Sequence, residues 1–100
     1  MAIMKAIFLD RDGVINKDPG FGDYIKSWKE FRFLPGALEA IMLLTECGYE
    51  IFVFSNQAGV AKGLFSEEAL NVINQNMLKE IEKKGGNLCI ANYYVQSPRG

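Results

Sequence analysis

The feature that most constrains the fold is a short apolar run that stops at two aspartates. The run Ala6–Leu9 ends at Asp10 and Asp12, and Gly13 follows at once. Along a strand, residues two apart project to the same face, so this spacing predicts that both carboxylates enter one space. Such a pair is costly unless a cation, a proton or phosphoryl chemistry compensates it. The pattern therefore predicts that these aspartates form a functional site and are not part of the hydrophobic core. If the strand persists, Arg11 points to the opposite face, which favours a backbone role for it.

Apolar runs that alternate with helical periodicity predict the order β-flap-α-β-α-β. The expected strands are residues 5–9, buried on both faces, then 49–54 and 88–95. Strands that alternate with helices imply an α/β fold with a parallel sheet and right-handed crossovers. Ligands of such sheets lie beyond the carboxyl ends of the strands. Asp10, Asp12 and Ser55-Asn56 all fall at such ends, so we expect them to converge.

The two expected helices have clear start and stop signals. Pro35-Gly36 opens the first, and Gly48 is placed to end it. Ser66 is a good N-cap for the second, which Gly85-Gly86 ends. The predicted buried stripe of this second helix is Leu70, Ile73, Met77 and Ile81. Residues 57–65 are expected to form a loop.

Residues 13–33 lack periodicity and carry turn signals, which predicts a flap. Its aromatic residues are Phe21, Tyr24, Trp28, Phe31 and Phe33. Packing over the sheet edge is their favoured use, and contact with substrate is the alternative.

Composition excludes several classes of function. At 100 residues the chain is expected to be one domain, 1–100, and a net charge of −1 argues against nucleic-acid binding. The absence of histidine removes the usual general base and the commonest zinc ligand. Cys47 and Cys89 are isolated, which favours small-hydrophobe roles and a reducing, cytoplasmic setting. Asp10 interrupts the apolar start too early for a membrane span, so no membrane partner is expected.

The predicted carboxylate pair suits phosphoryl chemistry. One carboxylate can attack phosphorus while its neighbour moves a proton. Two carboxylates that face a phosphate would repel it, so a divalent cation is required, and oxygen-only ligands favour Mg²⁺. The Ser55 hydroxyl, Asn56 and nearby backbone N–H groups are candidates to hold the other phosphate oxygens.

These residues resemble the motifs of the haloacid dehalogenase superfamily. Asp10-Arg11-Asp12-Gly13-Val14 resembles its first motif. This implies that Asp10 is the nucleophile at the Mg²⁺ site, and that Asp12 is the general acid/base whose backbone carbonyl also binds Mg²⁺. Ser55 matches the second motif, which binds the transferred phosphate. The string from Ser55 to Gly63 resembles the branch that contains histidinol-phosphatase and D-glycero-D-manno-heptose-1,7-bisphosphate phosphatase. The resemblance implies a Rossmann-like fold without a large cap, a phosphate monoester of the sugar phosphate or histidinol phosphate type, and substrate-side roles for Asn56, Gln57 and Lys62.

The chain also departs from this pattern. The superfamily draws a third-motif cation and a fourth-motif acidic pair from later strands, and the sequence ends before either. Many members of this branch carry zinc ligands directly after a Tyr-Tyr pair. Here Tyr93-Tyr94 is followed by Val95-Gln96-Ser97-Pro98, so those ligands are missing and no zinc is predicted. We therefore favour a fragment of a phosphatase over a natural short form, and expect the chain alone to hydrolyse phosphate esters poorly. An open edge at residues 5–9 predicts self-association.

Two other functions are compatible with these residues. One is a phosphoacceptor module that resembles response-regulator receivers, although those place the phosphorylated aspartate after the third strand. The other is a non-catalytic half-domain that pairs with another chain.

Overall fold

The computed structural model describes residues 5–20, 23–56 and 58–93, and for Ser55, Asn56, Ala58, Asn92 and Tyr93 it describes the backbone alone. The elements in chain order are β1 (Lys5–Asp10), a 3₁₀ turn η1 (Trp28–Glu30), α1 (Ala37–Glu46), β2 (Tyr49–Asn56), α2 (Ala58–Ala61), α3 (Glu67–Lys83) and β3 (Cys89–Tyr93). The predicted alternation of strands and helices is confirmed.

The three strands form one parallel sheet in the order β1-β2-β3. Ile7 is in register with Ile51, and Val53 is in register with Ile90. β1 is therefore paired on one side only within the described part of the chain. The carboxyl ends of β1 and β2 lie together, because Asp10 is in register with Phe54.

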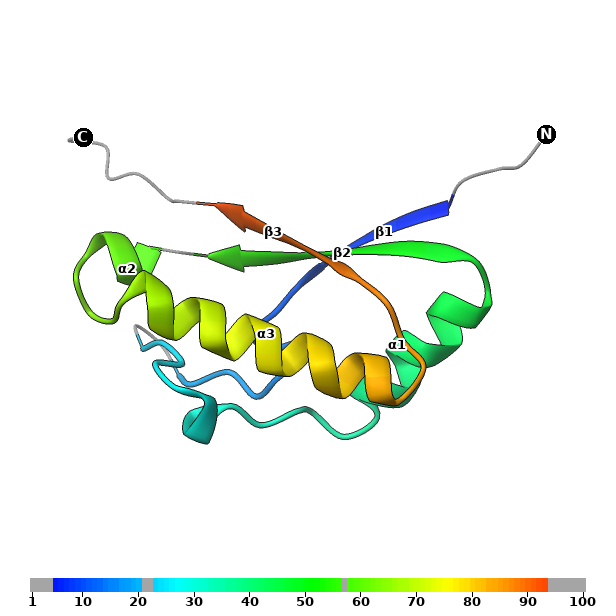
Figure 1. Ribbon diagram of the computed structural model, residues 1–100, viewed down its shortest axis with the longest axis horizontal. Helices are drawn as coiled ribbons and strands as arrows, with labels where there is room; N and C mark the ends of the chain where they lie inside the picture. Colours follow the sequence, from blue (N-terminus) through cyan, green and yellow to red (C-terminus); the bar gives the residue numbers. More distant parts are fainter. Residues whose placement is uncertain (1–4, 21–22, 57, 94–100) are drawn as a thin grey trace.

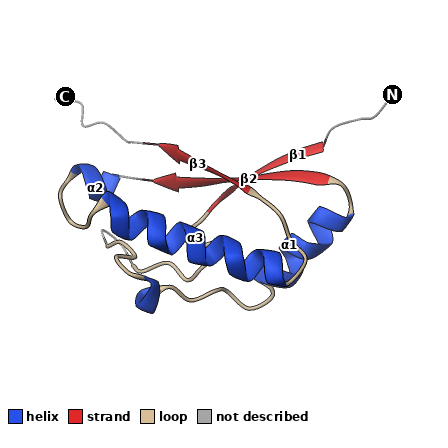
Figure 2. Cartoon of the chain, viewed as in Figure 1, coloured by secondary structure: helices blue, strands red, loops and turns tan. Residues whose placement is uncertain are grey.

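Both long helices pack on the same face of the sheet (Figures 1 and 2). Each right-handed crossover steps from one strand to the next in the same direction, which places α1 and α3 on one side. The core lies between these helices and the sheet. Its most buried members include Ile15, Ile41, Ile51, Val53, Ile73, Met77 and Ile81.

α3 follows the sequence prediction closely. The Ser66 hydroxyl accepts a hydrogen bond from the Ala69 amide at 3.0 Å, which caps the helix start. The four expected stripe residues, Leu70, Ile73, Met77 and Ile81, are all buried. One further buried residue, Asn74, is polar and was not predicted.

The second face of the sheet is open, so the prediction that the first strand is buried on both faces was wrong. Phe8 is 60% exposed and Phe54 is 37% exposed. The Phe8 ring stacks on Phe52 and Phe54, with centroid distances of 5.2 and 5.8 Å. These three side chains form a row on the face opposite the helices. The crossovers of this chain all lie on one side, so none of its described helices covers this row.

The flap is anchored at its neck and packs into the core. The Lys17 amide donates to the Arg32 carbonyl at 2.8 Å, and the Leu34 amide donates to the Ile15 carbonyl at 2.9 Å. Ile25 and Phe31 are buried, and Trp28 stacks on Phe31 with centroids 5.0 Å apart. The favoured packing role is therefore confirmed for these aromatic residues, and Phe21 lies outside the described residues.

Three smaller expectations need correction. The expected loop at 57–65 contains the short helix α2, and the third strand begins at Cys89 rather than Leu88. Cys47 and Cys89 are exposed, so neither is a core residue. Cys47 directly follows α1, and Cys89 is in register with Phe52 on the open face. Among the described residues, no helix combines the length and apolar character needed to cross a membrane.

A matched pair of substitutions on α3 tests the position of the core. Ile73 is fully buried, so Ile73→Ala should lower the free energy of unfolding by about 2–5 kcal/mol through lost burial and a cavity. Its neighbour Val72 is 51% exposed, and Val72→Ala should cost about 0.5 kcal/mol or less. Denaturant titration of both variants measures the difference, and equal losses would contradict the assigned helix face.

The open edge of β1 generates a second prediction. We expect the purified chain to associate as its concentration rises, because unpaired strand edges beside apolar surface template pairing. Phe8→Lys should restore the monomer by placing a charge on the edge strand, whereas Val72→Lys on α3 should not. Sedimentation velocity measures this against the monomer mass of 11.2 kDa. A wild-type chain that remains monomeric at every concentration would count against pairing.

Candidate active site

The site begins where β1 ends. Asp10 is the last residue of β1, and the Arg11 amide still donates to the Phe54 carbonyl of β2 at 3.3 Å. The chain then turns, and the Arg11 carbonyl accepts from the Ile15 amide at 2.8 Å and the Asn16 amide at 3.2 Å. This turn supplies the backbone role predicted for Arg11. Asp12 therefore lies on a turn and not on the strand.

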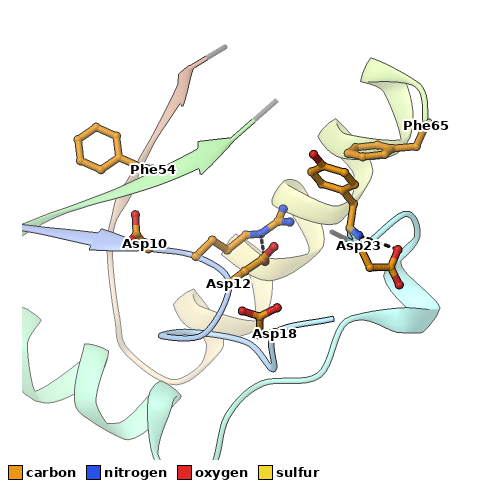
Figure 3. Close-up of a pocket in the computed structure, with 8 residues that line it drawn as sticks. Asp10, Asp12, Asp18, Asp23, Phe54 and Phe65 are labelled. Carbon is orange, nitrogen blue, oxygen red and sulfur yellow. Dashed lines mark hydrogen bonds and ion pairs between the residues drawn. The ribbon is translucent and has the colours of Figure 1, made fainter. Parts of the chain in front are cut away.

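The two carboxylates nevertheless share one space. A pocket of about 290 Å³ opens at the carboxyl end of β1 and β2. It is lined by Asp10, Arg11, Asp12, Asp18, Asp23, Tyr24, Phe54 and Phe65. Figure 3 shows Asp10 at the end of β1, with Asp12 and Asp18 on the segment that follows. The turn after β1 thus brings Asp12 to the pocket of Asp10, which the alternation of side chains along a strand was expected to do.

The side chain of Arg11 departs from the prediction that it points away. It is 6% exposed, and its Nε donates to Asp12 Oδ1 at 3.0 Å. Its Nη1 donates to Oδ1 of Asn74 on α3 at 3.2 Å. Alternation of side chains applies only while the strand lasts, and β1 stops one residue earlier. Arg11 is therefore part of the site.

Asn16 is a second residue that sequence reasoning missed. Its side chain is fully buried, and Nδ2 donates to Asp12 Oδ1 at 3.0 Å and to the Lys17 carbonyl at 3.2 Å. Its Oδ1 has no hydrogen-bond partner in the described part of the chain. Asn74 did carry a sequence signal, because it is a polar residue inside the apolar stripe of α3.

The flap contributes two more carboxylates to the pocket. Asp18 Oδ1 accepts a hydrogen bond from the Gly20 amide at 2.9 Å. Asp23 accepts from the Tyr24 amide at 2.8 Å and pairs with Lys26 at 3.3 Å. The amide hydrogen bond, assisted by Lys26, holds the pKa of Asp23 below its ordinary value of 3.8. Both aspartates belong to the turn signals of residues 13–33, so the sequence indicated a role in turns for them.

Lys62 lies beside the flap. Its Nζ is 3.4 Å from the Tyr24 hydroxyl and 5.9 Å from the centre of the same ring. Tyr24 also packs against Phe65, with ring centroids 5.9 Å apart. Gly59 lies beneath this contact. The flap and the β2–α3 connection therefore meet at Tyr24, which lines the pocket.

The predicted phosphate-binding residues are placed only in part. The backbones of Ser55 and Asn56 end β2, where they are in register with Asn92 and Tyr93 of β3. They thus follow Phe54, the residue in register with Asp10. Gln57 lies outside the described residues. The side-chain roles of Ser55, Asn56 and Gln57 stay predictions.

The donor set fits a magnesium ion that is shared with substrate. Mg²⁺ in phosphoryl-transfer sites is held by one or two carboxylates, with phosphate oxygens and water as the other ligands. Asp10 and Asp12 supply such oxygens to one pocket. Within the described ranges, no group of three or more His, Cys, Asp or Glu side chains is arranged to hold a metal.

The chain is similar in structure to phosphatases whose structures are known. No protein-family model matches the chain. The crystal structure of D,D-heptose 1,7-bisphosphate phosphatase from Bordetella bronchiseptica, complexed with magnesium and phosphate, superimposes with a TM-score of 0.83 at 38% identity. It covers 95% of this chain and 52% of that protein. A putative HAD-like phosphatase from Mesorhizobium loti gives a TM-score of 0.79 at 31% identity over 93% of this chain and 44% of that one. The chain is therefore similar in fold and sequence to these phosphatases over about half of their length.

The sequence relatives of the chain are phosphatases that act on heptose bisphosphates, according to their names. The D-glycero-beta-D-manno-heptose-1,7-bisphosphate 7-phosphatase of Bordetella bronchiseptica is 42% identical over 83 residues, which are 83% of this chain and 45% of that protein. The D-glycero-alpha-D-manno-heptose-1,7-bisphosphate 7-phosphatase of Mycobacterium tuberculosis is 40% identical over 79 residues, or 79% of this chain and 41% of that protein. The resemblance is thus to heptose bisphosphate phosphatases, and the chain spans less than half the length of these relatives.

A substitution at Gly59 tests the contact between the flap and the β2–α3 connection. A methyl group there would overlap the Phe65 ring and lie 3.1 Å from Cγ of Tyr24. Gly59→Ala should therefore lower the free energy of unfolding by about 1–3 kcal/mol, although alanine favours a helix. Adding Phe65→Ala should recover part of that loss relative to Phe65→Ala alone. Denaturant titrations of the four proteins measure it, and a Gly59→Ala variant as stable as the parent would contradict the packing.

Proposed function

We propose that this site carries out Mg²⁺-dependent hydrolysis of a small phosphate monoester through an aspartyl-phosphate intermediate. The observation that carries the proposal is the convergence of Asp10 and Asp12 on one pocket at the carboxyl end of the sheet. The phosphatase relatives support it. Their names favour a sugar phosphate over histidinol phosphate as the substrate.

Asp10 would act as the nucleophile. A carboxylate oxygen of Asp10 attacks phosphorus, an O–P bond forms, and the ester O–P bond breaks with its electrons on the leaving alcohol oxygen. Water then attacks phosphorus of the aspartyl phosphate, which releases inorganic phosphate and restores the carboxylate. Mg²⁺, which the Asp10 carboxylate and the Asp12 backbone carbonyl would hold, would offset the charge of the carboxylates and the phosphate.

Asp12 would move the proton in both steps. Protonated Asp12 gives its proton to the leaving oxygen, and the resulting carboxylate then takes a proton from the attacking water. The turn suits this role, because it places Asp12 in the pocket of Asp10 without making it part of the strand.

The remaining groups would bind the substrate. Ser55 and Asn56, which end β2, would hold phosphate oxygens, with Gln57 as a further donor. Lys62 would approach from the Tyr24 side of the pocket, where an ammonium group suits a phosphate or sugar oxygen. The pocket is small and rich in carboxylates, which favours a small substrate that arrives with its cation.

The proposed setting is the cytoplasm, with the chain as one domain that acts on a small phosphate ester and binds neither nucleic acid nor membrane. Since the chain spans less than half of its sequence relatives, we propose that it catalyses hydrolysis slowly by itself. A phosphoacceptor module remains the alternative, because the same Asp10 would accept a phosphoryl group in both readings.

Trapping the intermediate separates these readings. With Mg²⁺ and p-nitrophenyl phosphate, the wild-type chain should incorporate phosphate at Asp10 and release it slowly. Asp10→Asn should incorporate none. Asp12→Asn should slow release by about 10²–10⁴-fold, because general acid–base catalysis is lost. Acid quenching, followed by mass spectrometry of the Asp10 peptide, measures both steps.

The outcomes are distinct. Incorporation without release in the wild-type chain would support the phosphoacceptor alternative. Incorporation that persists in Asp10→Asn would reject the assigned nucleophile. Rapid turnover by the wild-type chain that disappears in Asp10→Asn would refute slow hydrolysis by this chain alone. Lys79→Gln on the exposed side of α3 serves as a control that should leave both steps unchanged.

A further inference from the structure

We propose that Arg11 is a positioning residue, which holds the Asp12 carboxylate by Oδ1 and leaves Oδ2 to exchange the proton with substrate. Arg11 Nε donates to Oδ1 at 3.0 Å. Asn16 Nδ2 donates to the same oxygen at 3.0 Å. Both hydrogen bonds within the described residues thus end on one oxygen. The chemical role of Oδ2 rests on the proposed function, but the orientation of the carboxylate does not.

Arg11 is itself held at its other end. Its guanidinium donates through Nη1 to Oδ1 of Asn74, which is 6% exposed on α3. A buried guanidinium is costly unless its donors are satisfied, and here one carboxylate and one amide satisfy two of them. α3 therefore fixes Arg11, and Arg11 fixes Asp12. A distance of 63 residues along the chain separates Arg11 from Asn74.

The planar shape of the guanidinium matters for this arrangement. Nε and Nη1 point in different directions from one rigid group, so Arg11 reaches Asp12 and Asn74 at once. An ammonium group is a compact point charge on a flexible stem and does not reproduce this fork. Arg11→Lys therefore keeps the charge and loses the geometry.

Asn16 provides the second donor to Asp12 Oδ1. Its Nδ2 is committed to two acceptors, Asp12 Oδ1 and the Lys17 carbonyl, which defines the orientation of the amide. Arg11 and Asn16 flank the turn that carries Asp12. Side chains held by such outer partners keep a single rotamer, which is the condition for a precise active site.

The orientation can be measured without any catalysis. Three-bond couplings about χ1 of Asp12, measured by NMR on the full 100-residue chain, should report one rotamer in the wild type. Arg11→Gln and Arg11→Lys should each give couplings averaged over several rotamers. If either variant fails to fold, Asn74→Leu provides the same release of the guanidinium from α3, with the exposed Gln75→Leu as its control. A merely structural arginine would change the thermal midpoint and leave the Asp12 couplings unchanged.

The catalytic consequence follows in a second measurement. For p-nitrophenyl phosphate hydrolysis with Mg²⁺, Arg11→Gln and Arg11→Lys should lower kcat by about 10–100-fold, as loss of an outer-shell partner does, and leave KM within about twofold. A single Asp12 rotamer in the folded Arg11 variants, or in Asn74→Leu, would overturn the proposal. Averaged couplings with unchanged kcat would overturn it also. A wild-type chain that forms no phosphoenzyme would reject the proposed function, while the couplings would still decide the orientation of Asp12.

Discussion

The candidate site depends on one residue, Arg11, which joins three parts of the molecule. Its amide extends the pairing of β1 with β2, and its carbonyl closes the turn that opens the flap. Its guanidinium links Asp12 to Asn74 of α3. The end of a strand, the start of a loop and the middle of a helix thus meet at one buried cation. At this junction Arg11 contacts one oxygen of the Asp12 carboxylate.

The sheet divides the molecule into unlike halves. Because both crossovers run along one face, α1 and α3 bury the side that carries Ile51 and Val53. The other side carries the exposed row of Phe8, Phe52 and Phe54. The pocket lies at the carboxyl end of the strands, where Asp10 from the sheet and Asp12 from the turn both line it. A site at this position can draw ligands from strand ends and from the flap, which explains why both contribute carboxylates.

Much of the fold was predictable, because periodic burial leaves a pattern in the sequence. The Leu70–Ile81 stripe and the Ser66 cap were placed correctly from spacing and residue type. The open face of the sheet was not predicted, because Phe8 is an apolar residue of the kind that usually lies in a core. An apolar local sequence is compatible with a strand that is buried on both faces. It does not show whether other elements cover the second face of the sheet. The prediction that Cys47 and Cys89 act as small hydrophobic residues was wrong for the same reason, because residue type alone does not determine exposure.

The sequence by itself determined the parallel direction of the strands, their order along the chain, the buried face of α3, and the two aspartates at the end of the first apolar run. These depend on the spacing of residues close to one another along the chain. Only the tertiary structure decided that Arg11 turns inward, that Asn16 and Arg11 share one oxygen of Asp12, and that Asn74 anchors the guanidinium. β1 ends at Asp10, so beyond it the turn sets side-chain direction, and the partner comes from a helix distant in sequence. The aspartate pair was therefore readable as a site, while the groups that orient it were not.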